Sequence, residues 1–232
     1  MTSMTARTSP VTLSSEPAGL RPVQLAWLAA AVFVVSAGYG ALMPLLPGWL
    51  TPLMPGATAA GIARHVGFLS GVYAAGVLVG ALMWGVVSDR VGRGRILIVG
   101  LVGYVASLLL LLVPGLGSLW AIYALRAATG FFVAAVVPVV SALVAEHTPA
   151  QQRARRFAWL SAMSLLGFLF GPALIAVADG VGSWVGYGAV STTLSAQVVL
   201  VLSALLGGVM MLGLAVTLPA SRAPGAAAEN NP

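Results

Sequence analysis

The sequence predicts an all-α membrane protein with six transmembrane helices, and three observations lead to that prediction. Hydrophobic residues make up 59% of the 232 residues and charged residues only 7%, whereas a soluble domain carries about 25% charged residues. Six apolar segments are long enough to cross the hydrocarbon core of a bilayer as helices. The arginines gather in alternate gaps between these segments. Such a chain cannot cover a water-facing surface with polar groups, so we expect lipid to be its solvent.

The six expected helices are joined by short connections. Each holds roughly 20 predominantly apolar residues, as a span requires, and they cover residues 24–46, 66–88, 96–114, 119–144, 157–178 and 196–218. The stretch 179–195 is expected to be a longer loop or a frayed helix end. The first apolar run is too long for a signal peptide and is expected to remain as a helix. We expect three regions, namely a flexible tail over 1–22, a six-helix domain over 23–218 and a disordered tail over 219–232.

The distribution of arginines predicts the orientation of the chain. All basic residues are Arg, and with both termini inside, nine of the eleven fall in the inside segments. Arg64 is left outside and Arg126 lies within the fourth helix. This follows the positive-inside rule and explains the net charge of +6 without nucleic acid as a partner. We therefore expect a multi-pass protein of a bacterial inner membrane with both termini cytoplasmic. Its first and last three helices run in opposite directions, which permits two inverted three-helix repeats.

The turn between the second and third helices carries the strongest motif. It reads GVVSDRVGRGR over residues 85–95 and places an acid at a helix end beside three arginines. Glycine at position 92 allows the tight reversal between antiparallel helices. A basic turn that only sets topology does not explain the acid and the two glycines at these spacings. The turn resembles the signature loop of the major facilitator superfamily, G-x-x-x-D-R-x-G-R-(K/R)-x, and matches it at Gly85, Asp89, Arg90, Gly92 and Arg93.

Arg126 and Gly130 form the second motif, which resembles the R-x-x-x-G element of the fourth helix of the same family. An arginine inside a membrane helix costs about 2.5–3.5 kcal/mol on insertion scales. It is therefore expected to face protein or water, and in the family it is linked with the substrate cavity and proton coupling. Because Arg126 lies near the outer end of its helix, a side chain that snorkels to the surface is the alternative.

Two further segments support the resemblance. Gly167, Gly171 and Pro172 in the fifth helix resemble the family's G-x-x-x-G-P element, which is associated with antiporters. The glycines permit close approach of a neighbouring helix, and the proline bends the helix. Tyr39 in the first helix either faces the pathway or is an interfacial aromatic. The acid that some drug exporters of the family carry in this helix is absent, which argues against a cationic drug.

The chain thus resembles the N-terminal six-helix half of a major facilitator superfamily transporter, over nearly all of residues 24–218. The resemblance implies alternating access for a small-molecule substrate, driven by protons or by the substrate gradient. It implies a pathway lined by Arg126, Tyr39 and Gly130 and a helix bend at Gly167, Gly171 and Pro172. It also implies an inner gating loop in which Glu146 pairs with Arg93, together with Gly85, Asp89, Arg90 and Gly92.

A transporter of this family normally has two such halves, with the substrate between them near the membrane midplane. This sequence supplies one wall, so we expect a second six-helix half to be needed. Three possibilities stay open at this point: a fragment, a half paired with a separately encoded partner, and a homodimer.

Other classes of protein fit the residues less well. An intramembrane serine protease needs Ser and His deep in facing helices, but His65 and His147 fall at helix ends. The sequence has no cysteine and no nucleotide-binding P-loop, so we expect no enzyme, no cofactor and no thiolate metal site. The chief alternative is a non-transporting membrane scaffold or a truncated, inactive transporter half. A membrane subunit of an ATP-driven pump is a further alternative.

Overall fold

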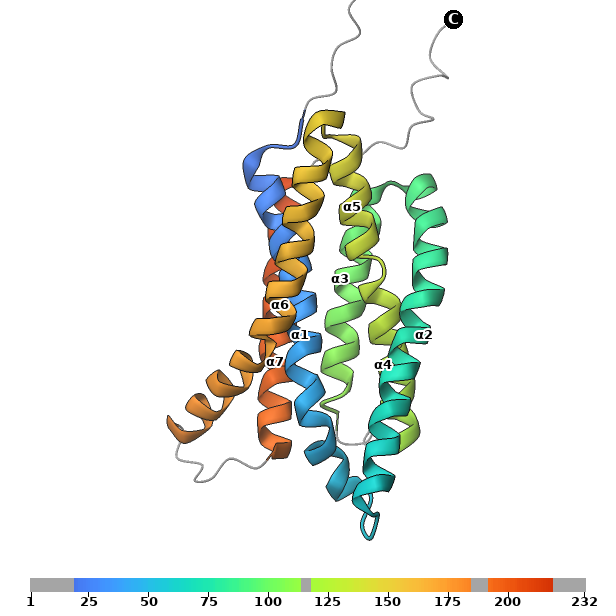
Figure 1. Ribbon diagram of the computed structural model, residues 1–232, viewed down its shortest axis with the longest axis vertical. Coiled ribbons are helices and arrows are strands. Elements are labelled where there is room, and N and C mark those ends of the chain that lie inside the picture. Colours follow the sequence, from blue (N-terminus) through green and yellow to red (C-terminus); the bar gives the residue numbers. More distant parts are fainter. Residues whose placement is uncertain (1–18, 114–117, 185–191, 219–232) are drawn as a thin grey trace, which may run out of the picture.

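The computed structural model describes residues 19–113, 118–184 and 192–218, and these residues form a bundle of helices joined by short turns (Figure 1). The elements in order are α1 (Pro22–Leu50), η1 (Thr51–Leu53), α2 (Ala59–Val91), α3 (Arg93–Leu110), α4 (Leu119–Val133), α5 (Val137–Glu146), α6 (Ala150–Trp184) and α7 (Thr192–Thr217). Six spans are long and apolar enough to cross a membrane, with α4 and α5 together forming one of them. The expectation of an all-α fold with six spans is therefore confirmed.

The two ends of the bundle differ in charge. The start of α1, the turns α2–α3 and α5–α6, and the end of α7 lie together at one end (Figure 1). We call this the arginine-rich end because its exposed side chains include Arg21, Arg90, Arg95, Arg153 and Arg155. Arg64 lies at the start of α2, near η1 at the opposite end, which we call the Arg64 end. The first and last described helices meet at the arginine-rich end, where Gln24 Nε2 donates to the carbonyl of Thr217 at 2.9 Å.

Several helices are longer than their expected membrane spans. Helix α2 begins at Ala59 rather than near residue 66, because Thr58 caps it by accepting a hydrogen bond from the Gly61 amide at 3.2 Å. Helix α6 begins at Ala150 with Gln and Arg residues that favour helix, and it continues to Trp184. Asp179 therefore lies inside α6, and residues 185–191 of the doubtful stretch fall outside the described residues.

The expected single helix over residues 119–144 is wrong in one respect, because it is broken at residues 134–136. Pro138 has no amide hydrogen to donate back to the carbonyl of Ala134, so the regular ladder cannot continue there. The chain instead tightens, with Ala135 N bonded to Phe132 O at 3.0 Å and Val136 N bonded to Val133 O at 2.9 Å. The sequence pattern Val137–Pro138 carries this signal, which a hydropathy reading overlooks.

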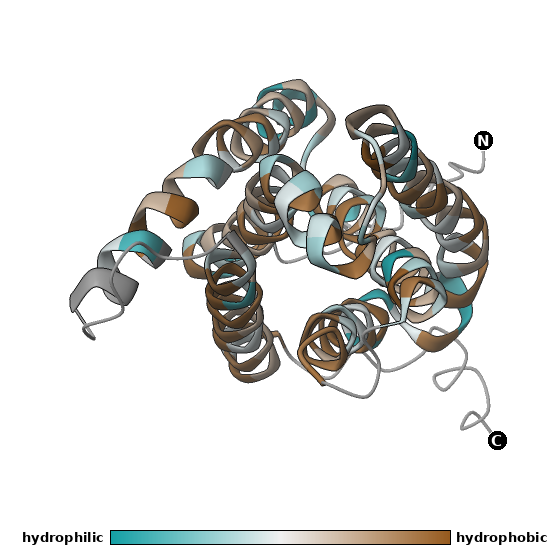
Figure 2. Ribbon diagram, turned by 90° about the horizontal axis from the view of Figure 1, so that it is seen from below, coloured by the Kyte–Doolittle hydropathy of each residue, from teal (hydrophilic) through white to brown (hydrophobic). Residues whose placement is uncertain are grey.

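Helices α1 and α4–α5 form the interior of the bundle, whereas α2 and α6 lie on its outside. Buried residues make up 56% of the most apolar stretch of α1 but only 11% of that of α2 and 17% of that of α6. The outward faces of α2 and α6 nevertheless carry large apolar side chains, including Leu78, Leu82, Leu165 and Leu169. Figure 2 shows the resulting predominance of hydrophobic residues along the helices. Apolar faces of this extent suit lipid or another helical unit rather than water.

Glycines set the closest helix contacts of the bundle. On α6, a Cβ atom at Gly167 would collide with the backbone carbonyl of Phe33 on α1, and one at Gly171 would meet the Gly40 backbone. On α4, a Cβ atom at Gly130 would collide with the backbone carbonyl of Tyr73 on α2. Small residues at such crossings let two backbones touch, which is how membrane helices gain packing contacts without a hydrophobic driving force.

Candidate functional site

A cavity of about 450 Å³ lies between α1, α2, the α4–α5 break and α6. Its walls are mainly apolar and aromatic, with Tyr39, Tyr73 and Phe168 contributing rings. A serine pair also lines the cavity, with Ser36 Oγ on α1 lying 2.9 Å from Ser164 Oγ on α6. The volume falls within the range of roughly 300–1,000 Å³ that small-molecule sites occupy.

The broken span shapes one wall of this cavity. Val133, Ala134, Val137 and Pro138, which flank or form the break, all line it. Because Ala135 N bonds to the carbonyl of Phe132, the carbonyl of Phe131 is released from the helix ladder, and Trp84 Nε1 on α2 donates to it at 2.8 Å. Irregular backbone at membrane depth is tolerated where it is buried in protein or lines a cavity, and both conditions hold here.

Arg126 lies behind the aromatic wall, and its side chain is only 2% exposed. The guanidinium carbon is 4.7 Å from the ring centroid of Tyr73 and 5.4 Å from that of Tyr39, which is cation–π geometry. The two rings in turn lie with their centroids 4.7 Å apart. The guanidinium therefore does not snorkel to the surface in this structure.

Gly130 explains how Arg126 reaches this position. It lies one turn after Arg126, where the backbones of α4 and α2 touch at Tyr73 and Val77. This contact draws the Tyr73 ring onto the guanidinium. The structure thus brings together the three residues expected to line the pathway, although Gly130 acts through backbone approach rather than through a side chain. Tyr73 and Tyr104 were not singled out from the sequence, and the glycine pair 76 and 80 on α2 was the available hint that this helix packs closely on a neighbour.

An ion-pair cluster occupies the arginine-rich end. Arg93 Nη2 lies 3.2 Å from Asp89 Oδ1 and 3.0 Å from Glu146 Oε1, so one arginine joins the end of α2, the start of α3 and the end of α5. Gly92 makes this possible, because its φ of 105° lies in the left-handed region that favours glycine. Both carboxylates are at least half exposed, so the pairs are hydrated.

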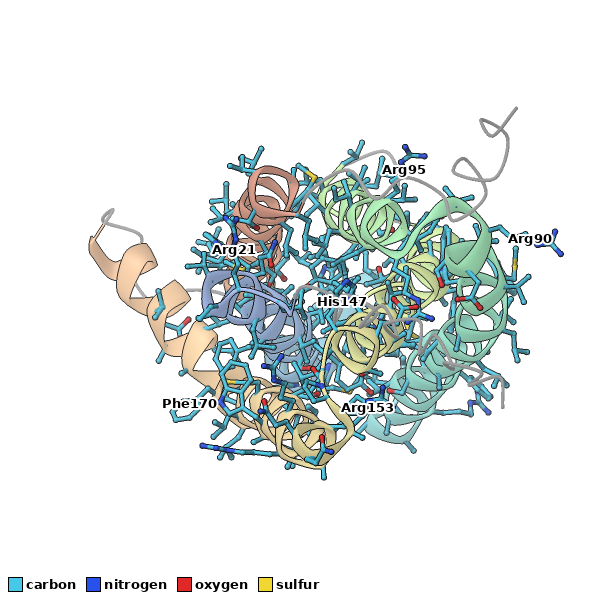
Figure 3. All side chains as sticks on the ribbon, turned by 90° about the horizontal axis from the view of Figure 1, so that it is seen from above. Arg21, Arg90, Arg95, His147, Arg153 and Phe170 are labelled. Atoms are coloured by element: carbon cyan, nitrogen blue, oxygen red, sulfur yellow. The ribbon has the colours of Figure 1, made fainter. Side chains whose placement is uncertain are left out.

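Not all residues of the expected gating loop belong to this cluster. Arg90 and Arg95 point outward at the edge of the bundle (Figure 3). Gly85 is exposed, and a Cβ atom there would meet nothing within 4 Å.

The expected helix-bend motif of Gly167, Gly171 and Pro172 lies on α6, which packs against α1. Gly167 and Gly171 are buried in the crossing, whereas Pro172, the next residue, is exposed. Beyond this point α6 leans away from α1 and α7 (Figure 1). An interior proline is an ordinary cause of such a bend.

The bundle of six spans around this cavity corresponds to half of a facilitator-type transport protein. A sequence model described as Major Facilitator Superfamily matches residues 28–231. The chain therefore belongs to the major facilitator superfamily, whose members are transporters rather than enzymes.

Individual relatives are drug-resistance proteins. The class B tetracycline resistance protein of Escherichia coli is 36% identical over 135 residues, which are 58% of this chain and 32% of the relative. The class G tetracycline resistance protein of Vibrio anguillarum is 33% identical over 146 residues, 63% of this chain and 36% of the relative. The quinolone resistance protein NorA of Staphylococcus aureus is 28% identical over 144 residues, 62% of this chain and 35% of the relative. The matched part thus spans about a third of each relative.

Proposed function

We propose that this chain forms one half of a secondary active transporter that exports a small organic solute by alternating access, with protons as the coupling ion. The observation that carries this proposal is the cavity of about 450 Å³ that is walled by a broken span and backed by the buried Arg126. Broken helices and buried charges at membrane depth are characteristic of transport pathways and costly elsewhere.

The chemistry of the cavity favours an aromatic substrate. The rings of Tyr39, Tyr73 and Phe168 offer stacking faces, and the Ser36–Ser164 pair offers hydroxyls. The tetracycline and quinolone resistance proteins to which the chain is similar are named for aromatic drugs. We therefore propose a drug-sized aromatic solute as the class of substrate, moved outward.

A second six-helix half is part of the proposal. Helices α2 and α6 both contribute to the lining of the cavity, for example with Val77 and Leu165, and both carry exposed apolar side chains. A second unit seated there would close the cavity from the other side.

The ion-pair cluster serves as the proposed inner gate. Arg93 holds α3 to α2 and α5 through two hydrated ion pairs, each worth only a fraction of a kcal/mol to about 1 kcal/mol. Contacts this weak can bias two packings of the bundle without locking either. With the arginine-rich end placed in the cytoplasm, the cluster would form in one access state and part in the other. Both termini would then be cytoplasmic.

The test is a flux measurement in inverted membrane vesicles that contain the full chain. We expect uptake of a radiolabelled tetracycline or quinolone that requires an imposed pH gradient and is lost in Arg126→Gln. Arg64→Gln, which removes an exposed arginine at the Arg64 end, is the matched control and should transport normally. If the inserted chain gave no uptake above vesicles without it, the alternative of a non-transporting scaffold or inactive half would be preferred.

Single cysteines test the orientation, since the natural chain contains none. A cysteine at position 95 should react with an impermeant maleimide only in inverted vesicles, and a cysteine at position 64 only in intact cells. The opposite pattern would contradict cytoplasmic termini.

A further inference from the structure

Arg126 has hydrogen-bond donors that nothing around it uses. Its Nε and Nη2 atoms are buried, and no described residue accepts a hydrogen bond from either of them. The rings of Tyr39 and Tyr73 lie against the flat guanidinium, but ring faces do not replace acceptors at its N–H edge. Buried charges in proteins are normally paired, so this edge is suited to an acceptor.

Among the described residues, no acid lies free to pair with Arg126. Asp89 and Glu146 both pair with Arg93 at the arginine-rich end. Asp179 lies toward the far end of α6 and accepts a hydrogen bond from Ser195 Oγ at 2.7 Å. The remaining two acids, Glu16 and Glu229, belong to the terminal segments outside the described residues. The described part of the chain therefore places no acid against Arg126.

A third unused donor lies beside the arginine. The Tyr104 hydroxyl on α3 is buried without a hydrogen-bond partner in the described structure. Tyr104 and Arg126 line the same small chamber, next to Gly38 on α1, where a side chain would collide with the Tyr104 hydroxyl. The Nε and Nη2 atoms form the edge of a guanidinium that a carboxylate binds with two parallel hydrogen bonds. The positive guanidinium matches the negative charge of a carboxylate. Its Nε and Nη2 groups and the Tyr104 hydroxyl can together donate three hydrogen bonds to the two carboxylate oxygens.

The two tyrosines separate this chamber from the open cavity. Tyr39 and Tyr73 line both spaces. The chamber has a volume of about 10 Å³, which is roughly the room of one water molecule. A carboxylate can reach Arg126 only when the two rings move apart. The ring of Phe168, 6.0 Å from that of Tyr39, would then face the aromatic body that follows the carboxylate.

We propose that the Tyr39–Tyr73 pair is a gate over an acceptor site for an aromatic carboxylate, bound by Arg126 Nε and Nη2 with help from the Tyr104 hydroxyl. This inference rests on the proposed function and deepens it by naming organic anions as the substrate class. The charged end of the solute lies in the chamber and its ring system lies in the cavity.

Three probes of one shape test the inference on the purified full chain in detergent: 2-naphthoate, its neutral amide and 2-naphthylmethylammonium. The midpoint of thermal unfolding is recorded against probe concentration. We expect naphthoate to raise the midpoint by a given amount at about a tenfold lower concentration than the amide, because two charge-assisted hydrogen bonds are made. The ammonium probe should bind most weakly.

Variants show whether Arg126 is responsible. Arg126→Lys keeps the charge but cannot offer two parallel N–H groups, so it should weaken naphthoate binding about tenfold. Tyr104→Phe should weaken it about threefold, as loss of one neutral donor does. Arg64→Gln should leave it unchanged. Equal binding of acid and amide by the natural chain, or unchanged naphthoate binding in Arg126→Lys, would overturn the inference.

Uptake of the acid and of the amide in the vesicle assay distinguishes failure of the carboxylate site from failure of the transporter proposal. Transport that prefers neither the acid nor the amide would leave the transporter proposal standing and reject the carboxylate site. Arg126-dependent binding of naphthoate by a chain that moves no solute would support the carboxylate site and reject the transporter proposal.

Discussion

The α1–α6 and α2–α4 crossings both pack through glycine, but the residues beside the glycines differ in kind. In both, glycine allows backbone to touch backbone: Gly167 and Gly171 against α1, and Gly130 against α2. The α1–α6 crossing holds a serine pair and ends in the bend at Pro172. The α2–α4 crossing holds a buried cation between two tyrosines and adjoins a broken helix. Glycine therefore sets the distance between helices, and the residues one turn away decide what that distance is used for.

Valine at either crossing should produce the largest loss of stability. Gly130→Val and Gly167→Val would each press a side chain onto a backbone carbonyl, and overpacking of this kind costs about 1–3 kcal/mol or more. Gly67→Val is the control, because a Cβ atom there meets nothing within 4 Å. Unfolding in mixed detergent and SDS measures the difference. Equal losses would show that the two crossings carry equal packing energy, and an unaffected Gly130→Val would contradict the close approach of α2 and α4.

Removing the proline of the α4–α5 break should affect transport more than stability. Pro138→Ala restores a backbone donor, and alanine is about 3 kcal/mol better than proline within a helix, so the chain should become as stable or more stable. In a continuous helix the Phe131 carbonyl would again accept a hydrogen bond within the helix, and Trp84 would lose it as an acceptor. The cavity wall would change shape, and because misplaced groups in a pathway reduce the rate, we expect flux to fall about tenfold. Pro172→Ala is the matched change at the other crossing. Normal flux in Pro138→Ala would remove the break from the mechanism.

Charge neutralisation in the ion-pair cluster should change stability by less than about 1 kcal/mol, since hydrated pairs contribute little. Asp89→Asn should nevertheless alter the transport rate while leaving membrane insertion intact. Insertion is followed by protease protection, and rate by the vesicle assay. An Asp89→Asn chain that transports at the normal rate would rule out a gating role for the cluster.

The serine pair should give the smallest effect. Ser36→Ala removes one interhelical hydrogen bond of 2.9 Å between α1 and α6, and such bonds average about 0.6 kcal/mol in a membrane protein. A loss several times larger, measured by the same unfolding assay, would mean that the pair does more than join the two helices.

Hydropathy and arginine placement predicted the six spans and the gathering of arginines at one end, because both depend on the chemistry of single residues along the chain. The break at residues 134–136 was missed, since an apolar stretch looks the same whether its helix is continuous or not. The pairing of Arg93 with Glu146 was anticipated by resemblance to the family, and the structure contains it.

The surroundings of Arg126 were less accessible from the sequence. Tyr73 and Tyr104 come from α2 and α3, and they meet Arg126 only because of how closely the helices cross. That distance depends on Gly130 facing the backbone at Tyr73. The pattern of one helix cannot reveal such a match between two helices.

The hydrogen bond from the Trp84 indole to the Phe131 carbonyl gives the α2–α4 crossing an intrinsic optical signal. Any rocking that slides these helices apart must exchange this acceptor for lipid or water, and the emission of the indole would shift in wavelength. With the other five tryptophans replaced by phenylalanine, the chain would report on its own conformational cycle without an attached dye.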